Sequence, residues 1–432
     1  MVFVYPREEE MTAEVVLEFI NQHKALLPKY LESKNMYEGN HDILNQEAKE
    51  EYKPDNRLVV NLAKYIVDTY NGYFIGIPVK VTHDDTKVNE SIQNFRNRSD
   101  MDDNESELAK ICAIYGHAYE YLYQDEEAYT NVVYNNPLDV FVVYDDTIAQ
   151  KPLFAVRYHY DKDEKLAGEM VDSNYRYYFK DNKGELTFTE EEQHFYGDVP
   201  IVEYIENEER QSVFENVKTL INAINKSLSE KANDVDYFSD AYIKILGEEL
   251  DEESIQQLRD NRIINLAGDG ASDVIVEFMQ KPNADTTQEN LLDRLLDLVF
   301  QVAMVANIND ESFGSASGVA LEFKLQPMKN LAVNKERKMK SGMQRRYKML
   351  FNLPTNITSA KRDEWINLGY VFTRNIPRNL ADEAKTAAKL EGIVSKETQL
   401  GTLSVVDNPQ LEKERMDKEN EPAPQYDFQV GE

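Results

Sequence analysis

The sequence predicts an α+β fold, in which a mixed helix-and-sheet region is followed by a series of long helices. Two patterns carry this prediction. Residues 115–205 hold several segments in which apolar and polar residues alternate, which is the period of a half-buried strand. From residue 213 onward the apolar residues recur at helical spacing instead, and two long helical segments enclose a short insert. The chain has 432 residues, more than one compact core usually holds, so we expect several modules.

The N-terminal region is expected to begin with two helices. Thr12 is a suitable side-chain cap for the first. In residues 54–68 the apolar side chains, Leu58 among them, fall on one helical face and predict the second. Glycines and a proline in residues 72–78 then interrupt the pattern before a strand at residues 79–81.

The strand-rich region is predicted from its alternation and its turns. Residues 153–160 alternate between the two faces of a strand. Two further strands, at residues 175–179 and 186–189, flank the turn sequence Asp-Asn-Lys-Gly at residues 181–184, which predicts a hairpin.

Two long helices with apolar stripes are predicted next, the first from residue 213 and the second from residue 287. The stripes consist of Val217, Leu220, Ile221, Ile224 and Leu228 in the first helix and of Leu291, Leu295, Leu298, Val302 and Val305 in the second. The insert between them is expected to hold a strand at residues 241–246, a helix around residues 253–259, and strands near residue 263 and at residues 274–278.

The last part of the chain begins with a loop and a third long helix. Small residues at 309–319 predict the loop, and residues 321–351 predict the helix, with a kink at Pro327. A strand at residues 370–373, a helix at residues 381–390 and a second capping signal at residues 395–398 follow. From residue 410 the charged, proline-containing sequence predicts a fraying helix and a disordered tail.

The charge balance limits the ways in which this protein can meet nucleic acid. The formal net charge is −31, from 48 Lys and Arg against 79 Asp and Glu. Such a surface does not bind nucleic acid all over, because phosphate binding requires Lys and Arg. It is compatible with a wall past which DNA slides, because like charges disfavour adsorption.

One helix reverses this balance. Residues 324–348 hold nine basic residues against one acidic residue, Glu336. Two interpretations stay open: a solvated interface face that complements acidic neighbours, or electrostatic contact with DNA or with an acidic partner subunit. The candidate contact residues are Lys335, Arg337, Lys338, Lys340, Arg345 and Arg346.

The sequence shows no catalytic signature. It contains neither a Gly-x-x-x-x-Gly-Lys-Ser/Thr phosphate loop nor a Gly-x-Ser-x-Gly nucleophile turn. The six histidines are scattered without ligand spacing. Asp145 and Asp146 could hold a divalent cation, but Asp-Asp-Thr after a strand is more often a turn. We therefore expect no catalytic residue, no metal and no cofactor.

Features of membrane or secreted proteins are not expected either. The N-terminus has no basic leader followed by an apolar stretch, so we expect no signal peptide. The most apolar span, residues 295–306, is too short and too polar to cross a bilayer. The single cysteine, Cys112, excludes an intrachain disulfide and lies in an apolar segment, which predicts a buried, unreactive side chain.

Taken in order, several segments of the chain resemble one family, the portal proteins of long-tailed phages that infect Gram-positive bacteria. The resemblance covers residues 31–407 and includes the helix after Phe214. The matching segments are residues 37–43 (YEGNHDI), 56–68 (NRLVVNLAKYIVD), 72–79 (GYFIGIPV), 116–122 (GHAYEYL), 199–204 (VPIVEY), 238–242 (FSDAY), 310–321 (DESFGSASGVAL), 372–377 (FTRNIP) and 395–398 (SKET).

This resemblance implies a ring-forming portal fold with wing, stem, clip and crown regions around a channel. By position, the wing would take residues 1–210, the stem residues 211–238 and 283–308, the clip residues 239–282, the tunnel loop residues 309–319, the long wing helix residues 320–354, the last wing strand and a small crown residues 355–409, and a disordered tail residues 410–432. The tunnel-loop residues nearest DNA would be Asp310, Glu311, Ser312, Phe313, Gly314, Ser315, Ala316, Ser317 and Gly318.

The resemblance also implies partners and a place in the virus. The ring would be a homo-dodecamer at one capsid vertex, through which terminase packages double-stranded DNA that later leaves by the same channel. Head-completion or adaptor proteins, scaffolding protein and the major capsid protein would be its other partners, and no membrane would be involved. It would be made in the host cytoplasm and end in the virion. Two alternatives stay open: another oligomeric capsid or tail-adaptor protein, and a metal-dependent DNA-processing enzyme that uses Asp145 and Asp146.

Overall fold

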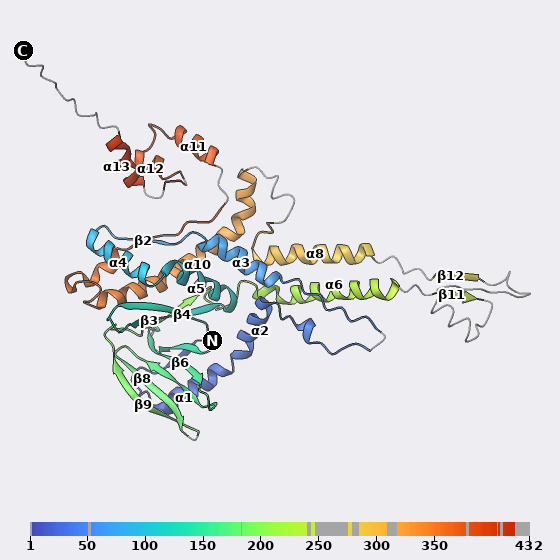
Figure 1. Ribbon diagram of the computed structural model, residues 1–432, viewed down its shortest axis with the longest axis horizontal. Helices are drawn as coiled ribbons and strands as arrows, with labels where there is room; N and C mark the ends of the chain where they lie inside the picture. Colours follow the sequence, from blue (N-terminus) through green and yellow to red (C-terminus); the bar gives the residue numbers. More distant parts are fainter. Residues whose placement is uncertain are drawn as a thin grey trace, which may run out of the picture. The chain divides into compact units, whose positions relative to one another are not determined.

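The protein is α+β, as the sequence predicts, and its chain divides into two compact units, Met1–Arg374 and Asn375–Glu432. Figure 1 shows the course of the chain in the computed structural model. The structure describes residues 2–50, 53–182, 184–239, 243–246, 275–278, 285–308, 318–376, 380–403, 405–406 and 409–419.

A six-stranded sheet forms one side of the first unit, with strand order β1-β5-β6-β7-β8-β9. The strands are β1 (Phe3–Tyr5), β5 (Val140–Asp145), β6 (Pro152–Tyr160), β7 (Leu166–Val171), β8 (Tyr175–Asn182) and β9 (Glu185–Gln193). β1 pairs with β5 in parallel, and the remaining neighbours are antiparallel. Helix α1 (Ala13–Lys24) packs its buried face on this sheet, and the side chain of Thr12 accepts the N–H of Val15, as its capping role predicts.

A smaller sheet lies against the first. Its strands β10 (Ile201–Ile205), β3 (His117–Gln124) and β4 (Thr130–Asn135) are antiparallel in the order β10-β3-β4. Tyr119 and Tyr121 of β3 pack with Val140 and Val142 of the large sheet. The predicted hairpin is confirmed, since Gly184 takes a positive φ of 92° and its N–H donates to Asp181 at 2.6 Å.

Helices fill the space next to the small sheet. They are α2 (Leu27–Glu38), the short 3₁₀ helix η1 (Asp42–Asn45), α3 (Leu62–Ile75), α4 (Thr86–Arg98) and α5 (Met101–Tyr115). β2 (Lys80–Thr82) confirms the strand expected after α3, and it pairs with β13 (Gly369–Val371).

One helix starts later than the sequence pattern predicts. The prediction placed Leu58 on the helix, but α3 begins at Leu62. The side chain of Asn61 caps it by accepting the N–H of Lys64 at 3.0 Å. Residues 54–60 precede this cap without regular secondary structure. Three of their backbone N–H groups bond to side chains of another helix instead, as described below.

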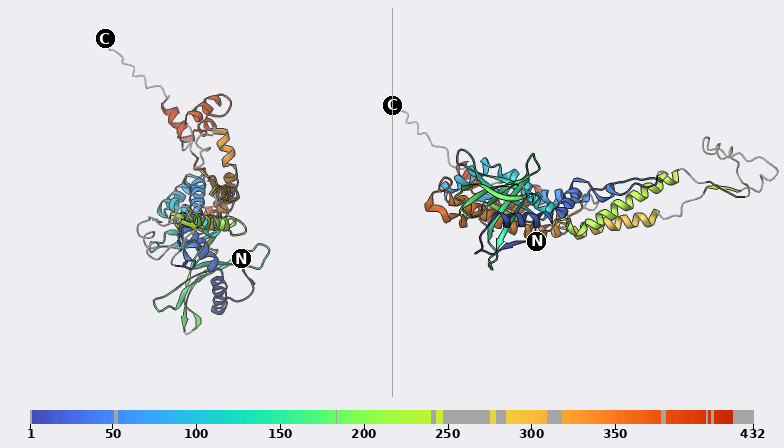
Figure 2. Two further views of the ribbon diagram at one scale, coloured as in Figure 1. Left: turned by 90° about the vertical axis from the view of Figure 1, so that its right-hand side faces the viewer. Right: turned by 90° about the horizontal axis from the view of Figure 1, so that it is seen from below.

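Three long helices follow, as predicted. After the 3₁₀ turn η2 (Glu215–Val217), the chain runs out along α6 (Lys218–Ser239) and returns along α8 (Asp285–Ala303). β11 (Ile243–Leu246) and β12 (Ile275–Phe278) form an antiparallel pair between them. α10 (Gly318–Asn352) contains Pro327, and Figures 1 and 2 show that its first turns and its later part run in different directions. The helix expected at residues 253–259, the strand near residue 263 and the loop residues 309–317 lie outside the described residues.

The end of the first unit carries η4 (Ser359–Asn367) and β13. The second unit consists, within its described residues, of α11 (Leu380–Lys389), α12 (Lys396–Leu400) and α13 (Pro409–Glu419). The capping signal is confirmed, because the side chain of Ser395 accepts the N–H of Thr398 at 3.2 Å. Residues 420–432, expected to form the tail, are outside the described part of the chain.

Candidate functional site

The helix pair α6–α8 leaves the body of the first unit, as Figures 1 and 2 show. Ile221 and Ile224 on α6 and Leu292 and Val299 on α8 are buried. An ion pair between Lys231 and Glu289 ties the two helices together further out. Where the pair meets the body, the rings of Tyr65 and Phe300 lie 5.6 Å apart, edge to face. The pair is therefore a packed unit over its described length.

An extended segment, residues 54–61, lies along α6, and we call it the strap. Three alternate backbone N–H groups of the strap donate to three side chains spaced four residues apart on α6. Val60 donates to Asn225 at 2.8 Å, Leu58 to Ser229 at 2.9 Å, and Asn56 to Asn233 at 2.6 Å. Four helical residues rise about 6 Å and two extended residues span about 6.7 Å, so the two repeats match over this length.

The side chains that hold the strap are themselves out of water. Asn225, Ser229 and Asn233 are all buried, and their polar atoms face the strap backbone. The amide of Asn225 also contacts the buried ring of His41 at 3.1 Å, and burial lowers the pKa of His41. This hydrogen-bonded row explains why α6 carries a buried polar stripe beside its apolar one.

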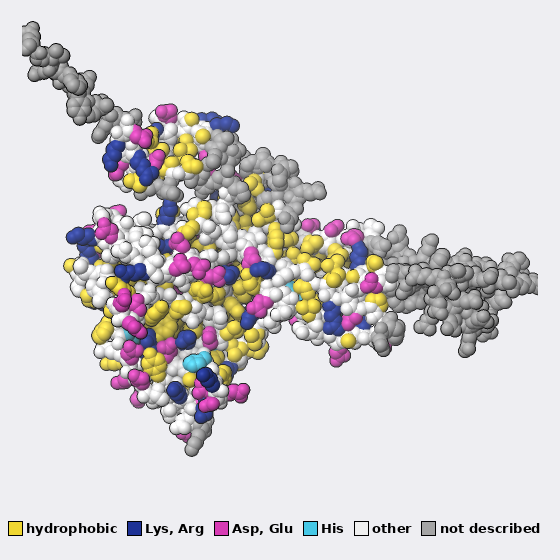
Figure 3. Space-filling view, in the orientation of Figure 1, with side chains coloured by type: hydrophobic (Ala, Val, Ile, Leu, Met, Phe, Trp, Pro, Cys, Tyr) yellow, Lys and Arg dark blue, Asp and Glu magenta, His cyan; other side chains and the backbone are white. Residues whose placement is uncertain are grey.

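Helix α8 carries a second apolar stripe that its own chain leaves largely uncovered. Leu291 is 50% exposed and Val302 is 44% exposed, and Leu295 and Leu298 between them are half-buried. We call these four residues the α8 outer stripe. Figure 3 shows hydrophobic side chains gathered over α8 and α6 next to the body. A contiguous apolar patch of this kind marks an interaction surface.

Two basic residues of α10 are buried and form ion pairs within the chain. The Lys335 ammonium is 2.6 Å from Glu206 and donates to the carbonyl of Ala109 at 2.8 Å. The Arg346 guanidinium meets Glu105 at 2.6 Å and Glu120 at 2.7 Å. Burial is the main cause that raises the pKa of Glu206, and the nearby Lys335 opposes it.

This burial corrects part of the sequence prediction. Lys335 and Arg346 were among the candidate contacts for DNA or a neighbouring subunit, but both side chains are buried. Their charges are neutralised by acids of α5, β3 and the chain after β10, so they have no surface to offer a partner. Both residues complement acidic neighbours, but these acids belong to the same chain and the two side chains are buried, so they are not part of a solvated face.

The other four candidates lie nearer to solvent. Lys338 pairs with Glu208, and Arg345 donates to Asp198 at 2.9 Å and to the carbonyl of Val199 at 3.0 Å. Lys340 is exposed, with its ammonium 5.5 Å from the centre of the Tyr370 ring, and Arg337 is exposed as well. Contact of these four residues with DNA or a second subunit stays a prediction.

Sequence reasoning missed the acidic half of these pairs. Glu105, Glu120 and Glu206 are buried, and the side chain of Glu203 is 5% exposed. Glu203 accepts hydrogen bonds from His117 and Arg210, each at 2.8 Å, and these partners hold its pKa below the usual range against the effect of burial. A usable signal was present at Glu120, which stands inside the apolar run Ala118–Leu122 where a buried residue is expected.

The predicted tunnel loop falls mostly outside what the structure describes. Asp310, Glu311, Ser312, Phe313, Gly314, Ser315, Ala316 and Ser317 are not among the described residues, and Gly318 is the first residue of α10. Their role therefore stays a prediction.

The paired aspartates form a turn, as the commoner interpretation expects. The Asp145 carboxylate accepts the Thr147 hydroxyl at 2.6 Å and the Lys151 N–H at 3.0 Å, and the Thr147 bond is the main cause that lowers its pKa. Asp146 accepts the N–H of Arg7 at 3.2 Å. Within the described residues no group of His, Cys, Asp and Glu is arranged to hold a metal ion.

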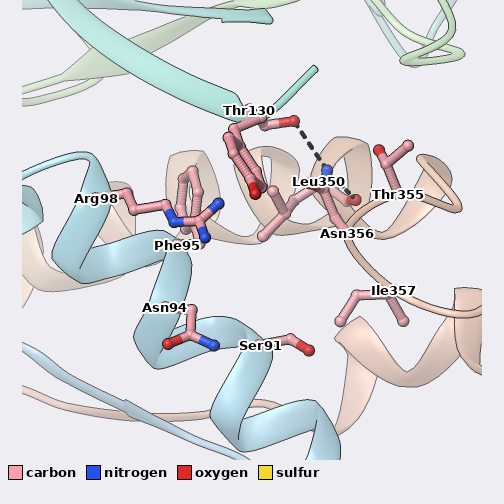
Figure 4. Close-up of a pocket in the computed structure, with 10 residues that line it drawn as sticks. Ser91, Asn94, Phe95, Arg98, Thr130, Leu350, Thr355, Asn356 and Ile357 are labelled. Atoms are coloured by element: carbon pink, nitrogen blue, oxygen red, sulfur yellow. Dashed lines mark hydrogen bonds between the residues drawn. The ribbon is translucent and has the colours of Figure 1, made fainter. Parts of the chain in front are cut away.

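A pocket of about 200 Å³ lies between α4, the start of β4 and the end of α10 (Figure 4). The guanidinium of Arg98 lies 3.6 Å from the centre of the Tyr129 ring, and the Asn356 amide donates to Thr130 at 2.9 Å. The lining residues are Ser91, Asn94, Phe95, Arg98, Tyr129, Thr130, Leu350, Thr355, Asn356 and Ile357. None of these lining residues is a histidine, carboxylate, cysteine or lysine.

The long helices do not have the character of membrane spans. Among the helices that the structure describes, none combines the length and the apolar content that crossing a membrane requires.

Comparison with known proteins adds to this geometry. The family model described as "Phage portal protein, SPP1 Gp6-like" matches residues 17–426. The portal protein of Bacillus phage SPP1 is 26% identical over 406 residues, which cover 88% of this chain and 79% of that protein. The portal protein of Clostridium phage phiCD119 is 23% identical over 417 residues, which cover 89% of this chain and 91% of that protein. The resemblance found in the sequence is confirmed: the chain belongs to the SPP1 Gp6-like family of phage portal proteins.

Proposed function

We propose that twelve copies of this chain close into a ring whose central channel passes the phage genome. Membership of the family makes the chain a structural head-to-tail connector of the phage capsid, and the ring is the form in which it would do this work. The observation that carries the proposal is the α8 outer stripe, an apolar surface that needs a partner. A head-to-tail contact that repeats around one axis gives a closed ring when the rotation between neighbouring copies closes on itself.

The portal regions assigned from the resemblance are proposed for the described elements. The N-terminal body to residue 210 would be the wing, and α6 and α8 would be the stem. With 22 and 19 residues, they are about 33 Å and 28 Å long, which suits a channel wall. β11 and β12 would belong to the clip, residues 309–319 would be the tunnel loop, α10 would run back into the wing, and the second unit would contain the small crown.

Terminase would deliver double-stranded DNA through this ring, and head-completion or adaptor proteins would later bind the same assembly. Scaffolding and major capsid proteins would contact the wing. The net charge of −31 supports transient passage of DNA without adsorption, because the wall and the DNA carry the same sign. The buried pairs of Lys335 and Arg346 support the same view, since they remove two basic groups from the surface.

The ring is tested by comparing two variants of α8 that add the same charge. Leu295→Asp places a carboxylate on the outer stripe, where an interface would have to desolvate it, and should abolish rings. Gln301→Asp places it on the exposed polar side of α8 and should leave rings intact. Mass photometry and negative-stain images of both variants and the unmodified chain give the measurement.

Three outcomes contradict the proposal. Unmodified protein that stays monomeric or dimeric at all protein and salt concentrations would argue against a ring. A flat lattice, or particles without a central hole, would favour another capsid or adaptor role. Metal-dependent nuclease activity that is lost on changing Asp145 would favour the enzyme alternative.

A further inference from the structure

We propose that the α8 outer stripe of one copy docks on the strap of the next copy, so that the strap is the receiving surface of the subunit interface. This inference rests on the proposed ring and names the two surfaces that meet in it.

The apolar arc of α8 is wider than one helical partner needs. The inner residues Leu292, Leu296, Val299 and Ala303 and the four residues of the outer stripe each recur at steps of four, three and four residues. At about 100° per residue, the two stripes together cover about 160° of the helix. A helix packed on one neighbour typically uses about 100°. The remaining arc, centred on Leu295 and Leu298, is available for a second partner.

The strap is anchored by one edge only. Its residues 56, 58 and 60 direct their N–H groups to α6, so Arg57 and Val59, which alternate with them, direct theirs away. The Arg57 guanidinium donates to the carbonyl of Leu44 at 3.0 Å. This bond ties the strap to η1, which precedes it in the connection between α2 and α3. The strap is thus held in place by polar contacts, and none of its apolar side chains is fully buried.

Apolar side chains of the strap and of η1 remain exposed or only partly buried. Leu58 and Leu44 are each 40% exposed, and Val59 and Val60 are half-buried. Polar side chains hold the strap against α6. The four apolar side chains are therefore available to be buried against another surface. The α8 outer stripe would pack against these leucine and valine side chains, because both surfaces are apolar.

The two surfaces lie on opposite sides of α6, and both Figure 1 and the right-hand view of Figure 2 show α6 between α8 and the connection that contains the strap. They cannot meet within one chain. A contact between the stripe of one copy and the strap of the next is heterologous, and closing it around an axis covers every stripe and every strap. A stripe-to-stripe contact would instead stop at a dimer and leave the straps uncovered.

Cysteine cross-linking between two different single variants tests this contact. Leu58→Cys and Leu295→Cys chains, distinguished by a tag and co-expressed, are assembled and treated with a short bis-maleimide. The native Cys112 is buried and its thiol pKa is raised by that burial, so it does not compete. We expect a covalent heterodimer on a denaturing gel, which is intermolecular by construction because each chain carries one reactive thiol.

Matched controls define what the heterodimer means. Pairing Leu58→Cys with Asp293→Cys, on the acidic side of α8, should give much less product. Leu295→Cys alone should give none, and a strong homodimer from it would establish the stripe-to-stripe contact and overturn the proposal. A second variant, Leu58→Asp, should lower the ring fraction while leaving the melting temperature of the dissociated chain unchanged, since Leu58 is already partly exposed.

The experiment separates this inference from the proposed function. Rings with a central hole in negative stain but no heterodimer would overturn the strap contact and leave the ring standing. Absence of rings from the unmodified chain would overturn both. Equal product from the Leu295→Cys and Asp293→Cys pairs would also reject the contact, because it would show collision without a defined interface.

Discussion

Arg346 joins α10 to two elements that lie more than 200 residues earlier in the chain. Its guanidinium contacts Glu105 of α5 and Glu120 of β3, and Arg96 of α4 also contacts Glu105, at 3.2 Å. A buried ion pair adds little stability compared with an apolar contact, but removing one partner leaves an uncompensated charge in the interior. The pairs therefore fix how α10 sits on the body more than they strengthen it.

Replacing Arg346 by Met should destabilise the protein by about 3–5 kcal/mol, because Glu120 then lies buried without its cation. Lys340→Met is the matched control, since Lys340 is exposed on the same helix, and its effect should stay within about 0.5 kcal/mol. Urea unfolding at one fixed protein concentration measures both. Equal, small effects would show that the Arg346 pairs do not fix α10.

The sequence could reveal the basic run of residues 324–348 but not which of its residues are buried. Lys335 and Arg346 are neutralised in the interior by acids more than 100 residues earlier in the chain. No local pattern encodes that match. The position of Glu120 within an apolar strand indicates a buried acid, but it does not identify the basic residue that pairs with it.

At the level of elements, α6 packs on α8 by one face and binds the strap by another. The polar row Asn225, Ser229 and Asn233 is visible in the sequence at steps of four, but its partner is a backbone, which has no sequence signature. Residues 54–60 were predicted to be helical because the bonds from their backbone to α6 leave no pattern in their own sequence. Leu58 fits a helical stripe equally well, and only the hydrogen bond from its N–H to Ser229 and the cap at Asn61 reject that structure.

Removing one of the three hydrogen bonds between α6 and the strap should loosen the strap locally. Ser229→Ala leaves the N–H of Leu58 without its acceptor, which should cost about 1–3 kcal/mol. Amide exchange of residues 56–60 should accelerate, while exchange in the core strands should not change. Ser227→Ala, half-buried on the same helix, is the control and should leave strap exchange unchanged. Exchange that stays slow after Ser229→Ala would show that the row does not hold the strap.

For the whole molecule, the sequence predicted the elements well and their partners poorly. α6, α8 and α10 lie within a few residues of their predicted ranges, because helical periodicity over such lengths is a strong signal. The parallel pairing of β1 with β5 and the strand order of the large sheet depend on contacts distant in sequence, so alternation could not provide them. The resemblance to portal proteins, carried by several short segments in order, identified the family where no single segment could.

The net charge predicts how assembly should respond to salt. Copies that each carry −31 repel one another, and the proposed interface between them is apolar. The ring fraction should therefore rise as the salt concentration is raised from about 0.02 M to about 0.5 M, because screening shortens the Debye length from roughly 20 Å to roughly 4 Å. Mass photometry at constant protein concentration measures it. A ring fraction that falls with salt would mean that ion pairs hold the subunits together.

The strap also sets an order of events in time. Its bonds to Asn225, Ser229 and Asn233 span 165, 171 and 177 residues, so the strap leaves the ribosome long before its partner exists. At roughly 5–20 residues per second, the wait is about 10–35 s. During that interval the extended strap has all its N–H groups free to pair with a stray strand. The completion of α6 gives three of these N–H groups their acceptors, so the strap stays exposed to misassembly at least until residue 233 has been made and has left the ribosome.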